Sequence, residues 1–303
     1  MKKINKTCLF LIFTFVISYS YSVFIWMAVI KTQSQTVYTI MAAIYMFVPL
    51  ISAILVKAVF KEPLFQGLLI SFKINRWFFA AWLIFPVVIL ASFGISLLFP
   101  YITYNPELTG LFDRAGSTVP PEQIETFKNQ LASLPVHYVW VALAQGLLAG
   151  ITINAIAAFG EEAGWRGFFL NQLKDTHFLK AVLIIGSVWG IWHAPLILMG
   201  HNYPQHPVIG VFMMVVFCVL LTPIMQYLTI KSKSVIAAAI AHGTMNAVAG
   251  LSIMSISGGN DLSAGITGLT GFITLIIFSA LIFIYDYFIS KEKIMVNKLG
   301  KYL

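Results

Sequence analysis

The chain has 303 residues, of which 59% are hydrophobic and only 10% are charged, and its mean hydropathy is +0.87. This composition excludes an ordinary soluble domain. It predicts an all-α, polytopic membrane protein, because helices satisfy their own backbone polar groups within a bilayer. The net charge of +8 does not indicate a nucleic-acid partner, since the basic residues cluster at the ends of apolar segments.

Eight apolar segments are long enough to cross a bilayer, which takes about 20 helical residues. In chain order we predict spans at 8–30, 37–56, 77–99, 138–160, 181–200, 208–230, 235–256 and 265–288. The first follows a basic start similar to that of a signal peptide. It is longer than a signal peptide and lacks a cleavage-site pattern, so we expect it to be retained.

The basic residues predict the orientation of these spans. Sixteen of the 19 Lys and Arg residues fall on the side of both termini, and only Lys31, Arg114 and Lys128 fall on the other. The positive-inside rule then places both termini in the cytoplasm. We therefore expect a multi-pass protein of a bacterial cell membrane, surrounded by membrane lipids.

Three parts of the chain follow from this pattern. Residues 1–136 hold the first spans and a long outer loop, 137–255 hold three polar motifs, and 256–303 hold the final span and a basic cytoplasmic tail.

Two helices are predicted outside the spans. In the outer loop, 100–135, a segment that begins with a proline predicts a short amphipathic helix, with Pro120, Ile124, Phe127 and Leu131 in helical register. We favour a connector over an interfacial lid for this helix. Residues 57–76 resemble a cytoplasmic surface helix with three apolar residues on one face, Leu64, Leu68 and Phe72.

The first polar motif is Glu161-Glu162-Ala-Gly-Trp-Arg166. Glu162 and Arg166 are four residues apart and share one helix face, so we favour an intrahelical ion pair that supports the structure. Glu161 is rotated by about 100° from Glu162 and has no local cation. Because an unpaired carboxylate at membrane depth is costly, Glu161 is a candidate general base.

The second and third motifs are Trp189-Gly-Ile-Trp-His193 and His242-Gly-Thr-Met-Asn246. Pro195 removes a backbone donor and should loosen the helix near His193. His242 and Asn246 lie on one helix face. Taken alone, His193 could be a packed core histidine, and the other two could provide interhelical hydrogen bonds.

Depth brings the motifs together. At 1.5 Å per residue, Glu161 and His193 lie about 18 Å from the predicted cytoplasmic ends of their helices, and His242 lies about 12 Å from its own. The three could meet at one level, nearer the cytoplasm. A straight helix from Tyr138 to Leu173 would be about 54 Å long, so it must tilt or kink, with three glycines as candidate positions, Gly146, Gly150 and Gly160.

Two kinds of chemistry fit these residues. A Glu and a His can activate a water while a second His and an Asn stabilise an oxyanion, as amide hydrolysis requires. Glu161, His193 and His242 could instead hold Zn²⁺ with an open water position. The His-Glu-x-x-His spacing of soluble zinc proteases is absent, and both Cys8 and Cys218 lie in apolar segments. The sequence leaves two alternatives open: the protein uses Zn²⁺, or it requires no cofactor.

The ordered motifs at 161–166, 189–193 and 242–246 resemble those of the CAAX protease and bacteriocin-processing family, which includes the type II CAAX prenyl endopeptidases. The resemblance covers about 137–255. Trp189 stands where the family usually has Phe.

The resemblance implies an intramembrane endopeptidase, with a cavity open to the cytoplasm, that acts on a peptide or protein. In such an enzyme Glu161 and His193 activate water, and His242 and Asn246 stabilise the oxyanion. The support of the site comes from the remaining motif residues, Glu162, Arg166 and Trp189. Members are described both as metalloproteases and as metal-independent glutamate proteases; Asn246, a poor Zn²⁺ ligand, slightly favours the second type.

Several alternatives stay open at this level. The substrate could be lipid-modified, and the role could be peptide processing or bacteriocin immunity. A proton- or ion-coupled transporter would spread polar groups through the membrane depth, and a noncatalytic scaffold would use them as interhelical hydrogen bonds. The outer-loop residues His201, His206 and Tyr203-Pro204 could narrow a cavity mouth, but we favour a simple loop role.

Overall fold

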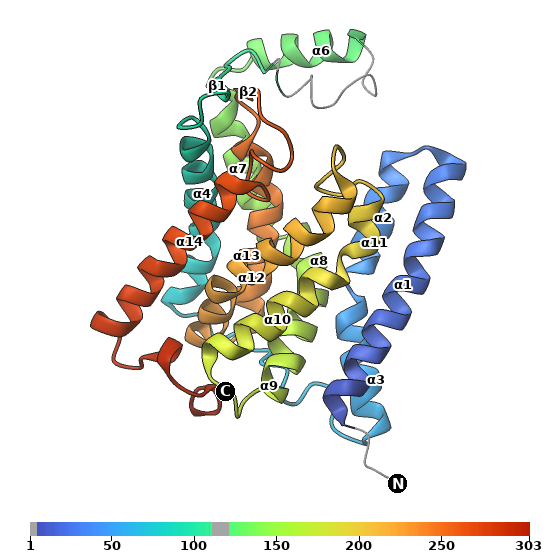
Figure 1. Cartoon of the computed structure of the whole chain (residues 1–303), viewed down its shortest axis with the longest axis vertical. Coiled ribbons are helices and arrows are strands. Elements are labelled where there is room, and N and C mark those ends of the chain that lie inside the picture. Colours follow the sequence, from blue (N-terminus) through green and yellow to red (C-terminus); the bar gives the residue numbers. More distant parts are fainter. Residues whose placement is uncertain (1–4, 109, 111–120) are drawn as a thin grey trace.

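The computed structural model describes residues 5–108, 110 and 121–303, and these form a bundle of helices with one very short two-stranded sheet (Figure 1). Six helical segments in this part of the chain are long and apolar enough to cross a membrane. They are Lys6–Thr32, Gln35–Val59, Arg76–Ser96, Pro207–Ser232, Val235–Ser252 and Leu269–Ile289. The predicted all-α, polytopic fold is confirmed.

Some of these segments contain more than one element. The whole-length helices are α1 (Lys6–Thr32), α4 (Arg76–Ser96) and α12 (Pro207–Ser232). The composite segments are α2 (Gln35–Tyr45) with α3 (Val48–Val59), α13 (Val235–Val248) with the 3-10 helix η3 (Ala249–Ser252), and α14 (Leu269–Ile284) with the π-helix η4 (Tyr285–Ile289).

By the same criterion of helix length and apolar composition, the predicted number of eight spans is higher than the number found in the described residues. All eight predicted segments are largely helical, but the fourth is broken after α7 (Tyr138–Gly150), and α8 (Ile153–Glu162) follows. The bend between Tyr138–Gly150 and the continuous helical segment Ile153–Gln172 is 51°. Counting that pair as one span gives seven among the described residues. The predicted span at 181–200 is interrupted after 15 residues, because α10 (Phe178–Trp192) stops at His193 and the five-residue α11 (Ala194–Leu198) follows.

The break in the fourth segment follows Gly150, one of the three predicted positions. A Cβ on Gly150 would lie 2.4 Å from the Thr244 hydroxyl oxygen, so α7 and α13 approach each other closely here. The chain turns at Thr152, and α8 then runs on in a new direction beside α13. Because of this kink, residues 138–173 do not form the single straight helix that would be too long for the bilayer.

The helices that carry the motifs lie in the middle of the bundle (Figure 1). On one side of α8, α10 and α13 stand α1, α2 and α3, and on the other stand α4 and α14. Asn and Ser side chains cap several helix starts: Asn75 accepts from the Trp77 amide on α4, and Ser234 from the Ile236 amide on α13.

The start of α1 and the C-terminal segment lie at the same end of the molecule (Figure 1). Lys6 forms an ion pair with Glu62 there. The predicted tail is docked rather than free, because two 3-10 turns, η5 (Ile294–Val296) and η6 (Leu299–Lys301), bury Leu299, whose amide donates to the Thr176 carbonyl. This common end agrees with termini on one side; which side is cytoplasmic stays a prediction, and Lys2, Lys3 and Arg114 from the charge count lie outside the described residues.

The predicted surface helix at 57–76 is wrong. Beyond α3, residues 60–75 form turns and extended chain. Gly67 and Leu69 have φ of +73° and +55°, which a right-handed helix does not allow. Leu68 is buried against Gly167 while Phe72 is 77% exposed, so the apolar residues do not share a face.

At the opposite end, the predicted helix in the outer loop is confirmed as α6 (Pro121–Ala132), which lies across that end of the bundle (Figure 1). Nearby, β1 (Thr103–Tyr104) pairs antiparallel with β2 (Ile256–Ser257). This two-stranded sheet ties the chain after α4 to the chain after α13. Whether α6 is a connector or a lid stays a prediction.

Candidate active site

The three motifs meet at one cavity of about 420 Å³ in the middle of the bundle. Four of the predicted site residues line it: Glu161, His193, His242 and Asn246. Trp189 also lines it, whereas Glu162 and Arg166 are fully buried behind the wall. The structure therefore brings together all seven residues singled out from the sequence, and it divides them by access to the cavity.

The first motif lies where the backbone widens. After Glu162, α8 continues into a seven-residue π-helix, η2 (Ala163–Phe169), and then into the short α9 (Leu170–Gln172). π-Helical turns are rare in proteins, and those that occur often lie at functional sites. Gly164 lets α3 approach, because a Cβ there would lie 2.3 Å from the Cβ of Pro49. This close packing seals one side of the two carboxylates.

Glu162 is the acceptor at the centre of a buried charge cluster. Its Oε1 accepts from Arg166 Nη1 at 3.1 Å, as the spacing predicted, and also from His242 Nδ1 at 2.9 Å. Arg166 Nη2 lies 3.4 Å from the Thr222 hydroxyl on α12. The second contact of Glu162 is not apparent in the sequence, since 80 residues separate the partners. It links the support pair directly to a cavity residue.

Trp189 contacts four of the other site residues. Its indole N–H donates to Glu161 Oε2 at 2.6 Å, and its ring lies 4.1 Å from the guanidinium carbon of Arg166. The rings of His193 and His242 lie 5.7 and 5.6 Å from it. A phenylalanine would keep the packing but could not donate to Glu161. No ion pair to Glu161 occurs among the residues that the structure describes.

His193 occupies the break between α10 and α11, as expected from Pro195. Its Nδ1 lies 2.8 Å from the Trp189 carbonyl. Because a carbonyl only accepts, Nδ1 carries the proton, and Nε2 of the neutral ring is an acceptor. The side chain is half-buried and lines the cavity, so this nitrogen is available to a water or substrate.

His242 and Asn246 lie one turn apart on α13. Gly243 allows α13 to pack on α8, since a Cβ there would lie 2.6 Å from the Ala155 nitrogen. With Nδ1 of His242 committed to Glu162, only Nε2 remains for the cavity. Asn246 is exposed where it lines the cavity.

The predicted zinc triad does not fit this arrangement. Among the described residues, no three His, Cys, Asp or Glu side chains are grouped so that they could hold a metal ion. Glu161, His193 and His242 line one cavity but do not converge on one point as ligands do.

Several cavity residues were missed in the sequence. Tyr45, buried at the end of α2, donates from its hydroxyl to the Trp192 carbonyl at 2.8 Å. Tyr38 lies two turns earlier and pairs with His201, which lines the cavity; the loop role favoured for His201 is therefore incomplete. The seven-residue spacing of the two tyrosines was a signal that they share a face of α2.

The cavity reaches the end of the bundle opposite the termini. Four of its polar lining residues lie at the start of α2 and in the loop after α11: Gln35, Tyr38, His201 and Asn202. The 27 residues of α1 carry the chain across the molecule, so the α1–α2 turn beside Gln35 lies far from Lys6 (Figure 1). From the sequence, both termini and the opening of the cavity are predicted to lie on the cytoplasmic side. The two predictions conflict if the cavity opens at this end, because the termini lie at the opposite end of the bundle.

Comparison with known proteins identifies the segment that holds these motifs. Residues 135–248 match the family described as type II CAAX prenyl endopeptidase Rce1-like, and the match includes all three motifs. This part of the chain is therefore similar to the Rce1-like family. A CAAX prenyl protease 2 from Methanococcus maripaludis is 41% identical over 49 residues, which are 16% of this chain and 18% of that protein. The alignment thus spans less than a fifth of this relative.

Proposed function

We propose that this protein is an intramembrane endopeptidase of the CAAX protease type. One observation carries the proposal: the four residues expected to do the chemistry line a single cavity, and the ion pair expected to support them is sealed behind it. The match of 135–248 to an endopeptidase family supports the same reaction class.

In the proposed reaction, Glu161 and His193 activate the attacking water. The Glu161 carboxylate takes one water proton, while His193 Nε2 accepts a hydrogen bond that orients the water. The oxygen attacks the scissile carbonyl carbon and forms a tetrahedral intermediate. Glu161 then returns the proton to the leaving amine as the C–N bond breaks. Trp189 holds the Glu161 carboxylate by its N–H at 2.6 Å.

The proposed oxyanion site consists of His242 and Asn246. His242 can donate from Nε2 only as an imidazolium, because its Nδ1 proton points to Glu162. A positive His242 together with Arg166 balances the charges of Glu161 and Glu162, which favours this state in an apolar interior. The Asn246 amide supplies the second donor.

The substrate is proposed only by class. The reaction requires a peptide or protein within reach of the membrane, and the relative's name makes lipid-modified CAAX peptides the first to test. We also propose two biological roles, which are peptide processing and bacteriocin immunity. The alternatives of a coupled transporter and a noncatalytic scaffold both lack the hydrolytic step.

The test is to replace Glu161 by Gln, which keeps the shape but removes the base. Membrane and lipid-modified peptides of cells with wild-type protein are compared with those of cells with Glu161→Gln by mass spectrometry. We expect cleavage products to fall by at least about a thousandfold, with unchanged protein yield. Glu125→Gln on the exposed face of α6 is the matched control. Equal products from wild type and Glu161→Gln would remove Glu161 from catalysis.

An assay on purified protein tests the glutamate-type mechanism. Purified protein treated with a chelator and dialysed is expected to keep its activity on any peptide identified above, because the proposed steps need only side chains. Activity that disappears and returns with Zn²⁺ would replace this mechanism by a metal-dependent one.

A further inference from the structure

A second cavity adjoins the catalytic one. It measures about 680 Å³ and lies between the end of α1, the α1–α2 turn and the loop after α11. Four residues line both cavities: Gln35, Tyr38, His201 and Asn202. A chain that occupied the catalytic cavity could therefore continue into the second one at this boundary.

One hydrogen bond stands at the boundary. The Tyr38 hydroxyl and His201 Nδ1 are 2.8 Å apart, and the two rings lie 5.9 Å from each other. Partial burial lowers the pKa of His201, so its ring is neutral at pH 7 and Nδ1 can accept from the tyrosine. A single bond between neutral groups is weak enough to exchange for a bond to a ligand.

The described residues that line the second cavity are a mixture of polar and apolar side chains, without Asp, Glu, Lys or Arg. Its polar groups are the amides of Gln33, Gln35 and Asn202 and the hydroxyls of Ser34 and Tyr38, with His201 beside them. Amides and hydroxyls both donate and accept, which matches the alternating N–H and C=O groups of a peptide. Apolar patches for side chains are given by Val29, Ile30, Met199 and Pro204. Within the described part of the chain, no Lys or Arg lines this cavity to select an anionic headgroup.

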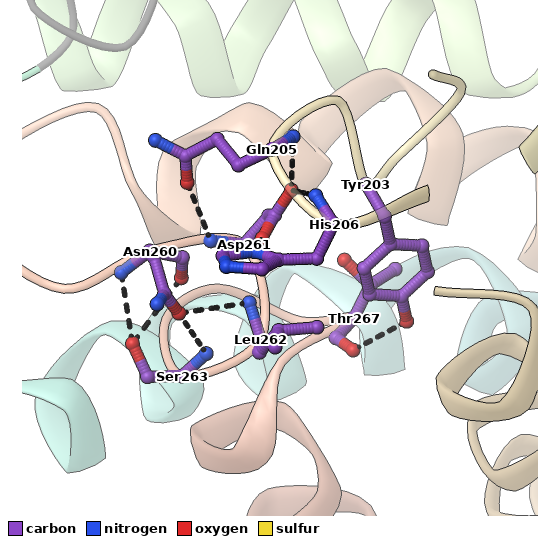
Figure 2. Close-up of polar contacts among 8 residues, drawn as sticks. All are labelled: Tyr203, Gln205, His206, Asn260, Asp261, Leu262, Ser263 and Thr267. Carbon is purple, nitrogen blue, oxygen red and sulfur yellow. Dashed lines mark hydrogen bonds and ion pairs between the residues drawn. The ribbon is translucent and has the colours of Figure 1, made fainter. Parts of the chain in front are cut away.

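The loop side of this cavity is firmly anchored (Figure 2). The Tyr203 hydroxyl donates to the Thr267 carbonyl at 2.7 Å, and Tyr203 is fully buried. Asp261 accepts from the Gln205 amide at 2.7 Å and pairs with His206 Nδ1 at 2.6 Å. These contacts tie the loop to the segment before α14. The wall beside His201 is therefore preorganised for a ligand, which lowers the entropic cost of binding.

We propose that the second cavity is a subsite for an extended, uncharged peptide segment next to the scissile bond, and that Tyr38 and His201 position the chain where it passes between the cavities. This inference rests on the proposed function and names the part of the substrate that the enzyme would recognise. Gln35 and Asn202 would bond the peptide backbone, and charged side chains would be disfavoured.

A binding experiment tests the subsite without cleavage. Glu161→Gln protein in lipid nanodiscs carries a photoreactive benzoylphenylalanine in place of Ile30, which lines the second cavity and is 57% exposed. The matched control carries it at Val16, 60% exposed on the same helix but outside the cavity lining. The probes are biotinylated nine-residue peptides of Ala, Ser and Gln, counterparts with two Lys or two Glu, and a biotinylated fatty acid.

We expect the uncharged peptide to crosslink at Ile30 and not at Val16, and at least about fivefold more strongly than the charged peptides. Gln35→Leu should weaken the crosslink about fivefold, and Gln35→Asn should restore part of it. Preference for the fatty acid, no preference among peptides, or no crosslink to any probe would overturn the proposal. Because the protein used is already inactive, failure of the subsite is distinguishable from failure of the peptidase mechanism, which the wild-type cleavage assay decides.

Discussion

Glu161 and Glu162 are neighbours in the chain but belong to two different regions of the molecule. Glu162 lies in a sealed region with Arg166 and Thr222, where its Oε1 accepts hydrogen bonds from Arg166 and His242. Glu161 lies on the cavity wall, where one indole N–H holds it. The 100° between successive helical residues is enough to separate a group that holds the structure from one that can meet a substrate. The predictions below test this division.

The largest expected effect on stability is that of Glu162→Ala. Removing this carboxylate strands the buried Arg166 and frees His242, which should cost about 3–5 kcal/mol and lower the folded yield. Thermal unfolding in detergent, followed by tryptophan fluorescence, measures the loss. A variant that folds as well as wild type but has lost activity would move Glu162 into the catalytic region and break the comparison.

Asn246→Ala should show the opposite pattern. Its side chain is exposed to the cavity, so we expect little change in unfolding temperature. Loss of an oxyanion donor should lower kcat by about 10²–10³-fold. Steady-state kinetics on a peptide found in the cleavage screen provide the measurement. Loss of folded protein with normal kcat in the remainder would assign Asn246 to the structure instead.

Trp189→Phe tests the residue that contacts both regions. The ring stays over Arg166, but the donor to Glu161 is lost. We expect a fall in kcat of about tenfold, with a loss of stability near 1 kcal/mol. A pH–rate profile separates this from a packing defect, because only a change at Glu161 should move the profile. An unaltered profile and rate would make the indole N–H dispensable.

The smallest expected effect concerns an ion pair outside both regions. Glu62 is partly exposed, and its hydrogen bond with Lys6 lowers the pKa of its carboxyl. A carboxyl whose folded pKa is lowered contributes stability above its unfolded value, near 4.5, and loses it as the pH falls through the lower folded value. Because water and salt screen the pair, Glu62→Gln should cost at most about 1 kcal/mol at pH 7 and less at pH 3. If Glu62→Gln lowered the free energy of unfolding as much as Glu162→Ala does, burial would not explain why the two carboxylates are expected to differ in their contribution to stability.

Much of the fold could be predicted from local pattern. The apolar segments became helices, and the kink fell at Gly150, because the length of an apolar stretch and the positions of glycine act locally. The surface helix at 57–76 failed because its apolar spacing ignored the backbone at Gly67 and Leu69. The docking of the C-terminal segment was also missed. It forms hydrogen bonds with residues 174–178 of the same chain, which are more than 100 residues away in the sequence.

The sequence by itself determined the chemistry that is available. Polar residues in apolar helices are costly, so Glu161, Glu162, Arg166, His193, His242 and Asn246 stood out, and the four-residue spacing of Glu162 and Arg166 was sufficient to pair them. Only the tertiary structure decided which groups face a cavity, that His242 bonds Glu162, and that Tyr38 meets His201 at a second cavity. Those contacts depend on how separate helices cross and approach, and helix packing is set by side chains far apart in the sequence.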